Sequence, residues 1–234
     1  FSTNVHIGFR FLLQLIHRQN DAHIDHMIEM PLNLAYLRNH IFTHRIGYFY
    51  MIASKFEEVI REGESAIRSK RLQVYSNHDI YAVELAGVLK NSMALAAGAL
   101  GGLGYGQNAM AFLITRGLGE IIRLATAMGA DRQAFLGLAG IGDLVATCTS
   151  PMSRNYTVGA RLAKGETLQQ IIDTSSEVAE GIKTVSISKK LADSTGIKLP
   201  IIQYIYKALF EGLNVEEALR YLMEYRWGYD ADYM

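Results

Sequence analysis

The sequence predicts a mainly α-helical protein in which a short α/β segment precedes the helices. From residue 80 onward, apolar residues recur at helical spacing, and glycine, proline and asparagine fall where helices begin and end. Between residues 48 and 79 the pattern changes to strand, helix, strand. The chain has 234 residues, half of them hydrophobic, and so can bury a sizeable core.

The α/β segment contains a single β-α-β unit. "YFYMIA" and "LQVYS" are typical of strands, and "SKFEEVIREGESAIRS" between them is typical of a helix. Ser54 and Glu57 have the spacing of a capping box at the start of that helix. Residues 1–47 form an atypical N-terminal segment that holds six of the seven histidines.

The helical region contains clear start and stop signals. Gly129 and Gly165 follow periodic runs as C′ glycines do, Pro200 stands near a first helical position, and Asn214 is a predicted N-cap. Residues 226–234 are expected to form a loose tail. The predicted helices are 80–100, 107–129, 131–138, 153–164, 166–173, 181–195, 200–211 and 214–225.

Lys90 and Asn91 form the first candidate site, because they stand together in the apolar stretch "ELAGVLKNSMALAAGAL". Their helical neighbours are small, so another chain segment or a ligand can come close. A lysine among apolar groups can act as a general acid or base near neutral pH. The alternative is a lysine that reaches the surface from the helix edge.

The second candidate site is "GLAGIGDLVATCTSPMSRN", residues 137–155. Its first half has glycines that permit a close approach, followed by Asp143, which could simply cap a short helix. In its second half Ser153 is a predicted N-cap, so Arg154 and Asn155 fall in the first helical turn. Free N–H groups, a hydroxyl and a guanidinium predict a phosphate site. The alternative is an ordinary capped helix with an exposed arginine.

Three other patterns favour structural interpretations. "GYGQNA", residues 104–109, fits a dinucleotide fingerprint but follows a predicted helix rather than a strand, which indicates a glycine-rich link. Cys148, the single cysteine, is expected to be a buried thiol rather than a nucleophile. A zinc site would need His23, His26, His40 and His44 together, and scattered histidines without a metal are the simpler interpretation.

The composition limits the partners and the compartment. Zero net charge gives no support to nucleic-acid binding, and one cysteine fits a reducing compartment, so we expect a cytoplasmic protein. No apolar run reaches the roughly 18 residues that a membrane span needs, so we expect no membrane span. The N-terminus does not have the pattern of a signal peptide. Because the chain begins with Phe1, we expect a fragment or a processed product.

Four segments carry a resemblance to a known family: "VELAGVLKNSMALAAG", "NAMAFLITRGLGEIIRLATAMGA", "FLGLAGIGDLVATCTSPMSRN" and "EVAEGIKT". They closely resemble the C-terminal domain of bacterial NAD(P)-dependent glycerol-3-phosphate dehydrogenase. The resemblance runs from about Tyr48 to Tyr225. It implies a helical C-terminal dehydrogenase domain of the 6-phosphogluconate-dehydrogenase-like class at residues 80–225. It also implies that residues 48–79 are a remnant of a Rossmann α/β domain.

The resemblance implies a role for each candidate residue. Lys90 matches the proton acceptor of the reaction that interconverts sn-glycerol 3-phosphate and dihydroxyacetone phosphate, and Asn91 and Asp143 match substrate-binding positions. Ser153, Arg154 and Asn155 match the substrate-binding trio. Arg154, Val178 and Glu180 match positions that contact the cofactor, NAD or NADP. A homodimer and a part in phospholipid synthesis are also implied.

The chain departs from the family pattern near its start. The family's glycine turn, a further lysine and a "GPS" or "GPT" segment have no counterpart here. We therefore expect a truncated or rearranged copy, or one whose start comes from a shifted reading frame, with weak cofactor binding. The alternative is a non-catalytic helical protein that binds phosphate or pairs with an intact subunit.

Overall fold

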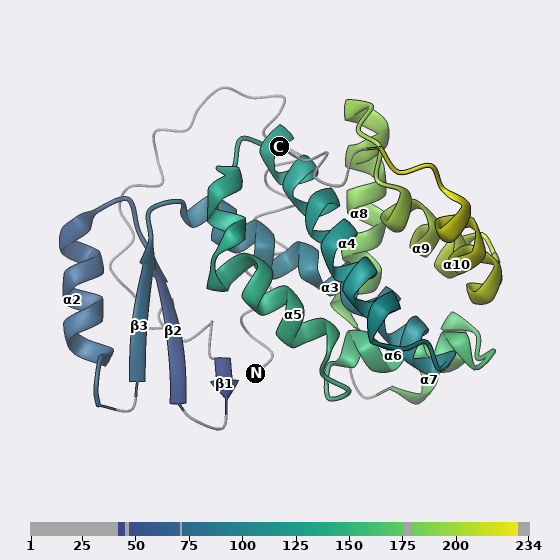
Figure 1. Ribbon diagram of the computed structural model, residues 1–234, viewed down its shortest axis with the longest axis horizontal. Coiled ribbons are helices and arrows are strands. Elements are labelled where there is room, and N and C mark those ends of the chain that lie inside the picture. The colour runs from purple at the N-terminus through teal and green to yellow at the C-terminus, as the bar shows by residue number, and fades with distance from the viewer. Residues whose placement is uncertain (1–41, 45–46, 71, 176–178, 229–234) are drawn as a thin grey trace. The chain divides into compact units, whose positions relative to one another are not determined.

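The computed structural model describes residues 42–44, 47–70, 72–175 and 179–228 (Figure 1). The chain divides into two compact units, Phe1–Leu85 and Ala86–Met234, at a point inside helix α3. Most of the described residues are helical, so the mainly α class is confirmed. The domain limits drawn from the sequence stay predictions.

The first unit contains a small sheet in the order β1-β2-β3. β1 (Phe42–His44) runs antiparallel to β2 (Gly47–Ala53), which runs parallel to β3 (Leu72–Asn77). Helix α2 (Glu57–Ile67) connects the two parallel strands, so the predicted β-α-β unit is confirmed and only β1 is unforeseen. The unit has a hydrophobic core of Ile52, Ile60 and Val74.

The predicted capping box at the start of α2 is wrong. The N-cap is Phe56, which has no side-chain oxygen, and Glu57 is already the first helical residue. Ser54 instead extends the strand pairing, because its N–H donates to the Asn77 carbonyl oxygen at 3.1 Å. Its hydroxyl accepts the Phe56 N–H at 3.1 Å, which shapes the turn into the helix.

The predicted long helices are confirmed with shifts of a few residues at their ends (Figure 1). Ser153 and Asn214 cap α6 and α10 as predicted, and Pro200 occupies the first turn of α9. Gly129 and Gly165 have φ of +94° and +90°, the conformation that glycine adopts after a helix. The helices are α3 (Ile80–Gly102), α4 (Gln107–Ala127), α6 (Arg154–Ala163), α7 (Leu168–Thr174), α8 (Glu180–Thr195), α9 (Pro200–Phe210) and α10 (Val215–Glu224).

The predicted helix 131–138 is not a regular α-helix. The chain forms a 3₁₀ helix, η2 (Arg132–Leu136), then a π-helix, η3 (Leu138–Gly142), which continues directly into α5 (Asp143–Cys148). Gly140 makes this possible, because a Cβ there would overlap the carbonyl oxygen of Phe135. Short π turns are frequent at functional sites.

Helix α3 combines membrane-spanning length with deep burial. Asp79 begins it, since its Oδ1 accepts the Ala82 N–H at 2.9 Å. By length and hydropathy α3 could cross a membrane, which corrects the expectation that no apolar stretch is long enough. However, 78% of its most apolar window is buried inside the protein, as in a core helix.

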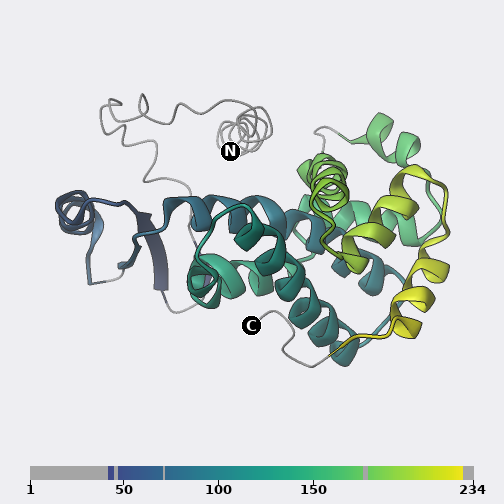
Figure 2. The same ribbon diagram turned by 90° about the horizontal axis from the view of Figure 1, so that it is seen from above.

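The C-terminal helices α8, α9 and α10 pack in succession, as Figures 1 and 2 show. The rings of Tyr204 and Tyr221 stack between α9 and α10, with centroids 5.7 Å apart. Glu120 of α4 is 1% exposed and holds the start of α9. Its two carboxylate oxygens accept the N–H groups of Ile201 and Ile202 at 2.6 and 3.1 Å.

Candidate functional site

The candidate site is built on α3 and on the close approach of α6 to it. A Cβ at Gly159 of α6 would overlap the carbonyl oxygen of Leu95, and a Cβ at Gly98 of α3 would overlap that of Tyr156. The two helix backbones therefore touch. The sequence left open whether a chain segment or a ligand approaches the small residues near Lys90, and here a chain segment does. This contact fixes α6 against α3, the helix that carries Lys90.

Lys90 and Asp143 form an ion pair between α3 and α5. The two side chains are 21% and 11% exposed, so the pair is mostly screened from water but not closed off. Asp143 does not cap α5: it is the first residue after the π-helix, and Gly142 precedes it in helical conformation. The Asp143 side chain does not cap the helix and instead faces Lys90.

Thr147 is a member of this cluster that the sequence reasoning missed. One turn after Asp143 on α5, its hydroxyl lies 2.6 Å from the Asp143 carbonyl oxygen and 3.3 Å from Oδ1. The i, i+4 spacing in "DLVAT" was the available signal, because residues four apart share a helix face. The hydroxyl donates its one proton mainly to the closer carbonyl oxygen, so Thr147 lies beside the carboxylate of Asp143.

Cys148 is confirmed as a buried thiol. Burial, which disfavours the thiolate, raises its pKa to about 12; nearby Lys90 lowers the pKa and nearby Asp143 raises it. At neutral pH the group is therefore a protonated thiol, which is a poor nucleophile.

Asn91 and Asn155 form a second link between α3 and α6. The Asn155 Nδ2 donates to the Asn91 Oδ1 at 3.0 Å, and the Asn155 Oδ1 accepts the Gly181 N–H at 2.8 Å. Gly181 is the second residue of α8, which begins at Glu180. Hydrogen bonds thus connect α3, α6 and α8 next to Lys90.

The remaining predicted residues lie at the starts of α6 and α8. Ser153 caps α6 by accepting the Tyr156 N–H at 3.4 Å, and Arg154, the first helical residue, is exposed. Glu180 is the first residue of α8 and partly exposed. Val178 lies outside the described residues, as do His23, His26 and His40 of the zinc alternative.

Two features bear on dinucleotide binding. "GYGQNA" links α3 to α4, with Gly104 at a φ of +76° and Gly106 as the N-cap of α4, so it is the helix link that was predicted. Between β2 and α2, where a Rossmann unit can carry its glycine turn, the sequence reads Ser54-Lys55-Phe56. The described residues therefore include no glycine turn of this kind, and the expectation of weak cofactor binding stays a prediction.

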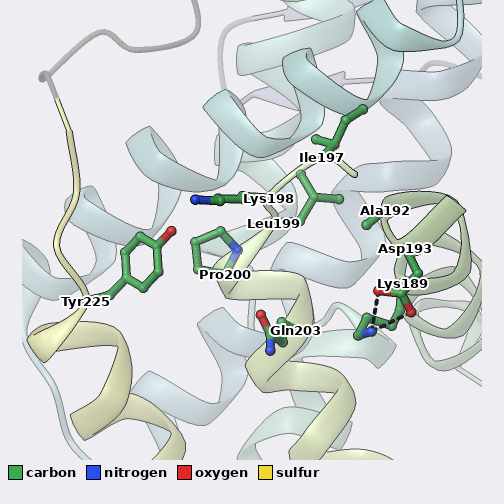
Figure 3. Close-up of a pocket in the computed structure, with 9 residues that line it drawn as sticks. All are labelled: Lys189, Ala192, Asp193, Ile197, Lys198, Leu199, Pro200, Gln203 and Tyr225. Atoms are coloured by element: carbon green, nitrogen blue, oxygen red, sulfur yellow. Dashed lines mark hydrogen bonds and ion pairs between the residues drawn. The ribbon is translucent and has the colours of Figure 1, made fainter. Parts of the chain in front are cut away.

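A cavity of about 360 Å³ lies away from these residues, at the junction of α8 and α9 (Figure 3). No predicted site residue lines it. In the close-up, Lys189 points to Asp193, with which it pairs at 2.6 Å, while Tyr225 and Lys198 stand on the other side. Its lining is Lys189, Ala192, Asp193, Ile197, Lys198, Leu199, Pro200, Gln203 and Tyr225.

Comparisons with known proteins agree with the resemblance found in the sequence. The family model described as NAD-dependent glycerol-3-phosphate dehydrogenase C-terminus matches residues 79–220. The glycerol-3-phosphate dehydrogenase (NAD(P)+) of Teredinibacter turnerae is 46% identical over 182 residues, which are 78% of this chain and 54% of that protein. That of Macrococcus caseolyticus is 46% identical over 172 residues, 74% of this chain and 52% of that protein.

The fold is also similar to a solved structure. The crystal structure of glycerol-3-phosphate dehydrogenase from Coxiella burnetii superposes with a TM-score of 0.72 at 34% sequence identity. The match covers 77% of this chain and 55% of that one. The chain thus spans about half the length of the relatives it matches.

Proposed function

Because this chain belongs to the NAD-dependent glycerol-3-phosphate dehydrogenase family, we propose that it binds sn-glycerol 3-phosphate and dihydroxyacetone phosphate and interconverts them, with NAD or NADP as hydride carrier. The observation that carries this proposal is the Lys90–Asp143 ion pair, which stands beside the linked amides of Asn91 and Asn155. Lys90 of this pair can act as an acid or base, and the neighbouring amides can hydrogen-bond to a small phosphorylated molecule.

Lys90 is proposed to move the proton of the C2 oxygen. Oxidation of a secondary alcohol needs a base at this oxygen, and reduction of the ketone needs an acid. The ion pair with Asp143 holds the Lys90 side chain in place, and an ammonium group is what donates a proton to the carbonyl oxygen in the reduction.

Arg154 is proposed to hold the phosphate group. It is exposed at the first position of α6, where backbone N–H groups without helical partners and the helix dipole favour an anion. A guanidinium forms bidentate hydrogen bonds to phosphate oxygens. The resemblance adds Ser153 and Asn155 as substrate-binding positions and Asn91 as a further contact.

Arg154, Val178 and Glu180 are also proposed to contact the dinucleotide, on the resemblance alone. The described residues include no glycine turn after a strand, so dinucleotide binding by this chain is expected to be weak. We further propose a cytoplasmic homodimer that supports glycerophospholipid synthesis. The buried single thiol fits a reducing compartment, and the dimer rests on the family.

Calorimetric titration with sn-glycerol 3-phosphate and with dihydroxyacetone phosphate tests the substrate assignment. Arg154→Leu is expected to weaken binding by about tenfold or more, because a charge-assisted contact is lost. Arg220→Leu removes an exposed arginine of α10 that pairs with Glu217, and should leave binding unchanged. No binding by the native chain, or equal losses in both variants, would contradict the proposal.

Titration with NADH and NADPH separates the enzyme from the non-catalytic alternative. Dinucleotide binding by the native chain would exclude a protein that retains only the phosphate site. Phosphate-ester binding without any dinucleotide binding would favour that alternative.

A further inference from the structure

The cavity at the junction of α8 and α9 shares no residue with the Lys90–Asp143 site. Its volume of about 360 Å³ falls in the range of small-molecule sites in proteins. Its lining combines apolar side chains, among them Leu199 and Pro200, with a few polar groups. Such a combination is typical of sites that hold the apolar body of a small molecule and orient it by a few hydrogen bonds.

The charged groups that line this cavity differ in their partners. The Lys189 Nζ donates to both carboxylate oxygens of Asp193 at 2.6 Å, and it lies 5.8 Å from the centre of the Tyr206 ring. These two charges compensate each other. Lys198, on the other side of the cavity in Figure 3, is exposed and has no hydrogen bond or ion pair with its side chain in the part of the chain that the structure describes. The lining therefore carries one uncompensated positive charge.

Two further hydrogen-bond donors line the cavity together with Lys198. The Tyr225 hydroxyl and the Gln203 side-chain amide make no hydrogen bond to any of the described residues. In the view of Figure 3 the three side chains lie around Pro200. An ammonium, a phenol and an amide nitrogen can all donate to the oxygens of one anionic group.

The Tyr225 ring is held in place by the segment that follows α10. It contacts the Trp227 ring, with centroids 4.9 Å apart. Trp227 in turn packs edge-on against Phe112 of α4 at 5.6 Å and lies 5.4 Å from the Arg116 guanidinium. Its Nε1–H donates to the Leu222 carbonyl oxygen at 3.3 Å. The phenol is therefore positioned before a ligand arrives, which lowers the entropy cost of binding.

We propose that this cavity binds a small organic anion, a molecule that carries one carboxylate or phosphate group on a short apolar body. The anionic group accepts hydrogen bonds from Lys198, Tyr225 and Gln203, and the body packs against the apolar part of the lining. A cationic ligand is disfavoured, because the Asp193 carboxylate is already paired with Lys189. This site goes beyond the proposed function and does not depend on it.

Titration with simple probes tests the charge and the apolar body separately. n-Butyl phosphate and n-butyrate carry the two anionic groups on the same body, inorganic phosphate has the charge alone, and n-butanol has the body alone. Trp227 is the single tryptophan and contacts Tyr225, so its fluorescence reports on the cavity while calorimetry gives the affinity. At least one butyl anion should bind with a dissociation constant of about 1 mM or tighter, and the tighter of the two identifies the anionic group. Inorganic phosphate and n-butanol should bind about tenfold more weakly or less.

Matched variants locate the bound anion. Lys198→Gln removes the uncompensated charge and should weaken binding of the better butyl anion about fivefold, the upper end for an ion pair that stays in contact with water. Lys190→Gln removes an exposed lysine of α8 that does not line the cavity, and should leave binding unchanged. Tyr225→Phe keeps the ring against Trp227 and removes only the hydroxyl, so it should also weaken binding.

Arg154→Leu keeps this test separate from that of the proposed function. A probe phosphate has the same chemistry as the substrate phosphate proposed to bind at Arg154, so the titrations are repeated in this variant. The affinity for the butyl anion and the response of Trp227 should persist there. Their loss in Arg154→Leu would place the anion at the substrate site and overturn the inference. No binding of either butyl anion, binding of n-butanol as tight as theirs, or equal losses in Lys198→Gln and Lys190→Gln would overturn it as well.

Discussion

Replacing Gly159 by alanine should loosen the contact between α3 and α6 on which the site is built. The added Cβ would overlap the Leu95 carbonyl oxygen and would lie 2.9 Å from the backbone nitrogen of Ala99. These neighbours are backbone atoms inside a helix and cannot rotate away. The two helices must therefore separate if the substituted chain is to fold.

The cost follows from two opposing effects. Overpacking a well-packed contact costs about 3 kcal/mol at the upper end of its usual range. The higher helix propensity of alanine returns about 1 kcal/mol. The net loss of about 2 kcal/mol should lower the melting temperature of a chain of this size by about 4–8 °C.

Differential scanning calorimetry of Gly159→Ala beside Gly106→Ser measures this effect. Gly106 is the N-cap of α4, and a Cβ added there would meet no atom within 4 Å. Because serine is a good N-cap, the melting temperature of Gly106→Ser should hold or rise slightly. Gly159 is four residues after Asn155 on α6, so its substitution should also weaken substrate binding. An unchanged melting temperature in Gly159→Ala, or an equal fall in both variants, would refute the reasoning.

Two further predictions concern buried groups. Cys148 should react with a thiol reagent at pH 8 only when the protein unfolds, because the thiol is buried. Burial also raises the pKa of this thiol from the ordinary value of 9.0 to about 12. The stabilisation that comes from keeping the thiol protonated should therefore be full below pH 9 and decline as the pH rises toward 12, which a series of melting curves would detect. Glu120→Ala should leave the N–H groups of Ile201 and Ile202 without their carboxylate acceptor. The free energy of unfolding, measured with urea, should fall by about 2–6 kcal/mol, because two buried donors lose their partner. A fall of less than about 1 kcal/mol would contradict this role of Glu120.

Local chemistry was enough to predict most of the helices. Ser153 and Asn214 were identifiable as caps because a short side-chain oxygen before a periodic run satisfies N–H groups two or three residues later. Ser54 had the same signature but no such role, since sheet pairing with Asn77 extends the strand past it. The capping rule describes a helix end and contains no information about a neighbouring strand.

Non-local contacts explain what the sequence did not reveal. Residues 131–138 have helical periodicity, but burial of Phe135 and the approach of Gly140 to it turn the chain into 3₁₀ and π segments. Lys90 and Asp143 were chosen from separate motifs, and their pairing across 53 positions became visible only in the fold. The same holds for the amides of Asn91 and Asn155, which are 64 positions apart.

The most direct test of the central claim is turnover by the native chain and by Lys90→Ala. The assay follows the loss of NADH or NADPH absorbance on addition of dihydroxyacetone phosphate, with Lys189→Ala as the control for a lysine that pairs with Asp193 away from the site. Turnover should fall by about a hundredfold or more in Lys90→Ala and persist in Lys189→Ala, because a general acid–base group contributes on that order. Turnover that survives the loss of Lys90, or no turnover by the native chain, would contradict the account.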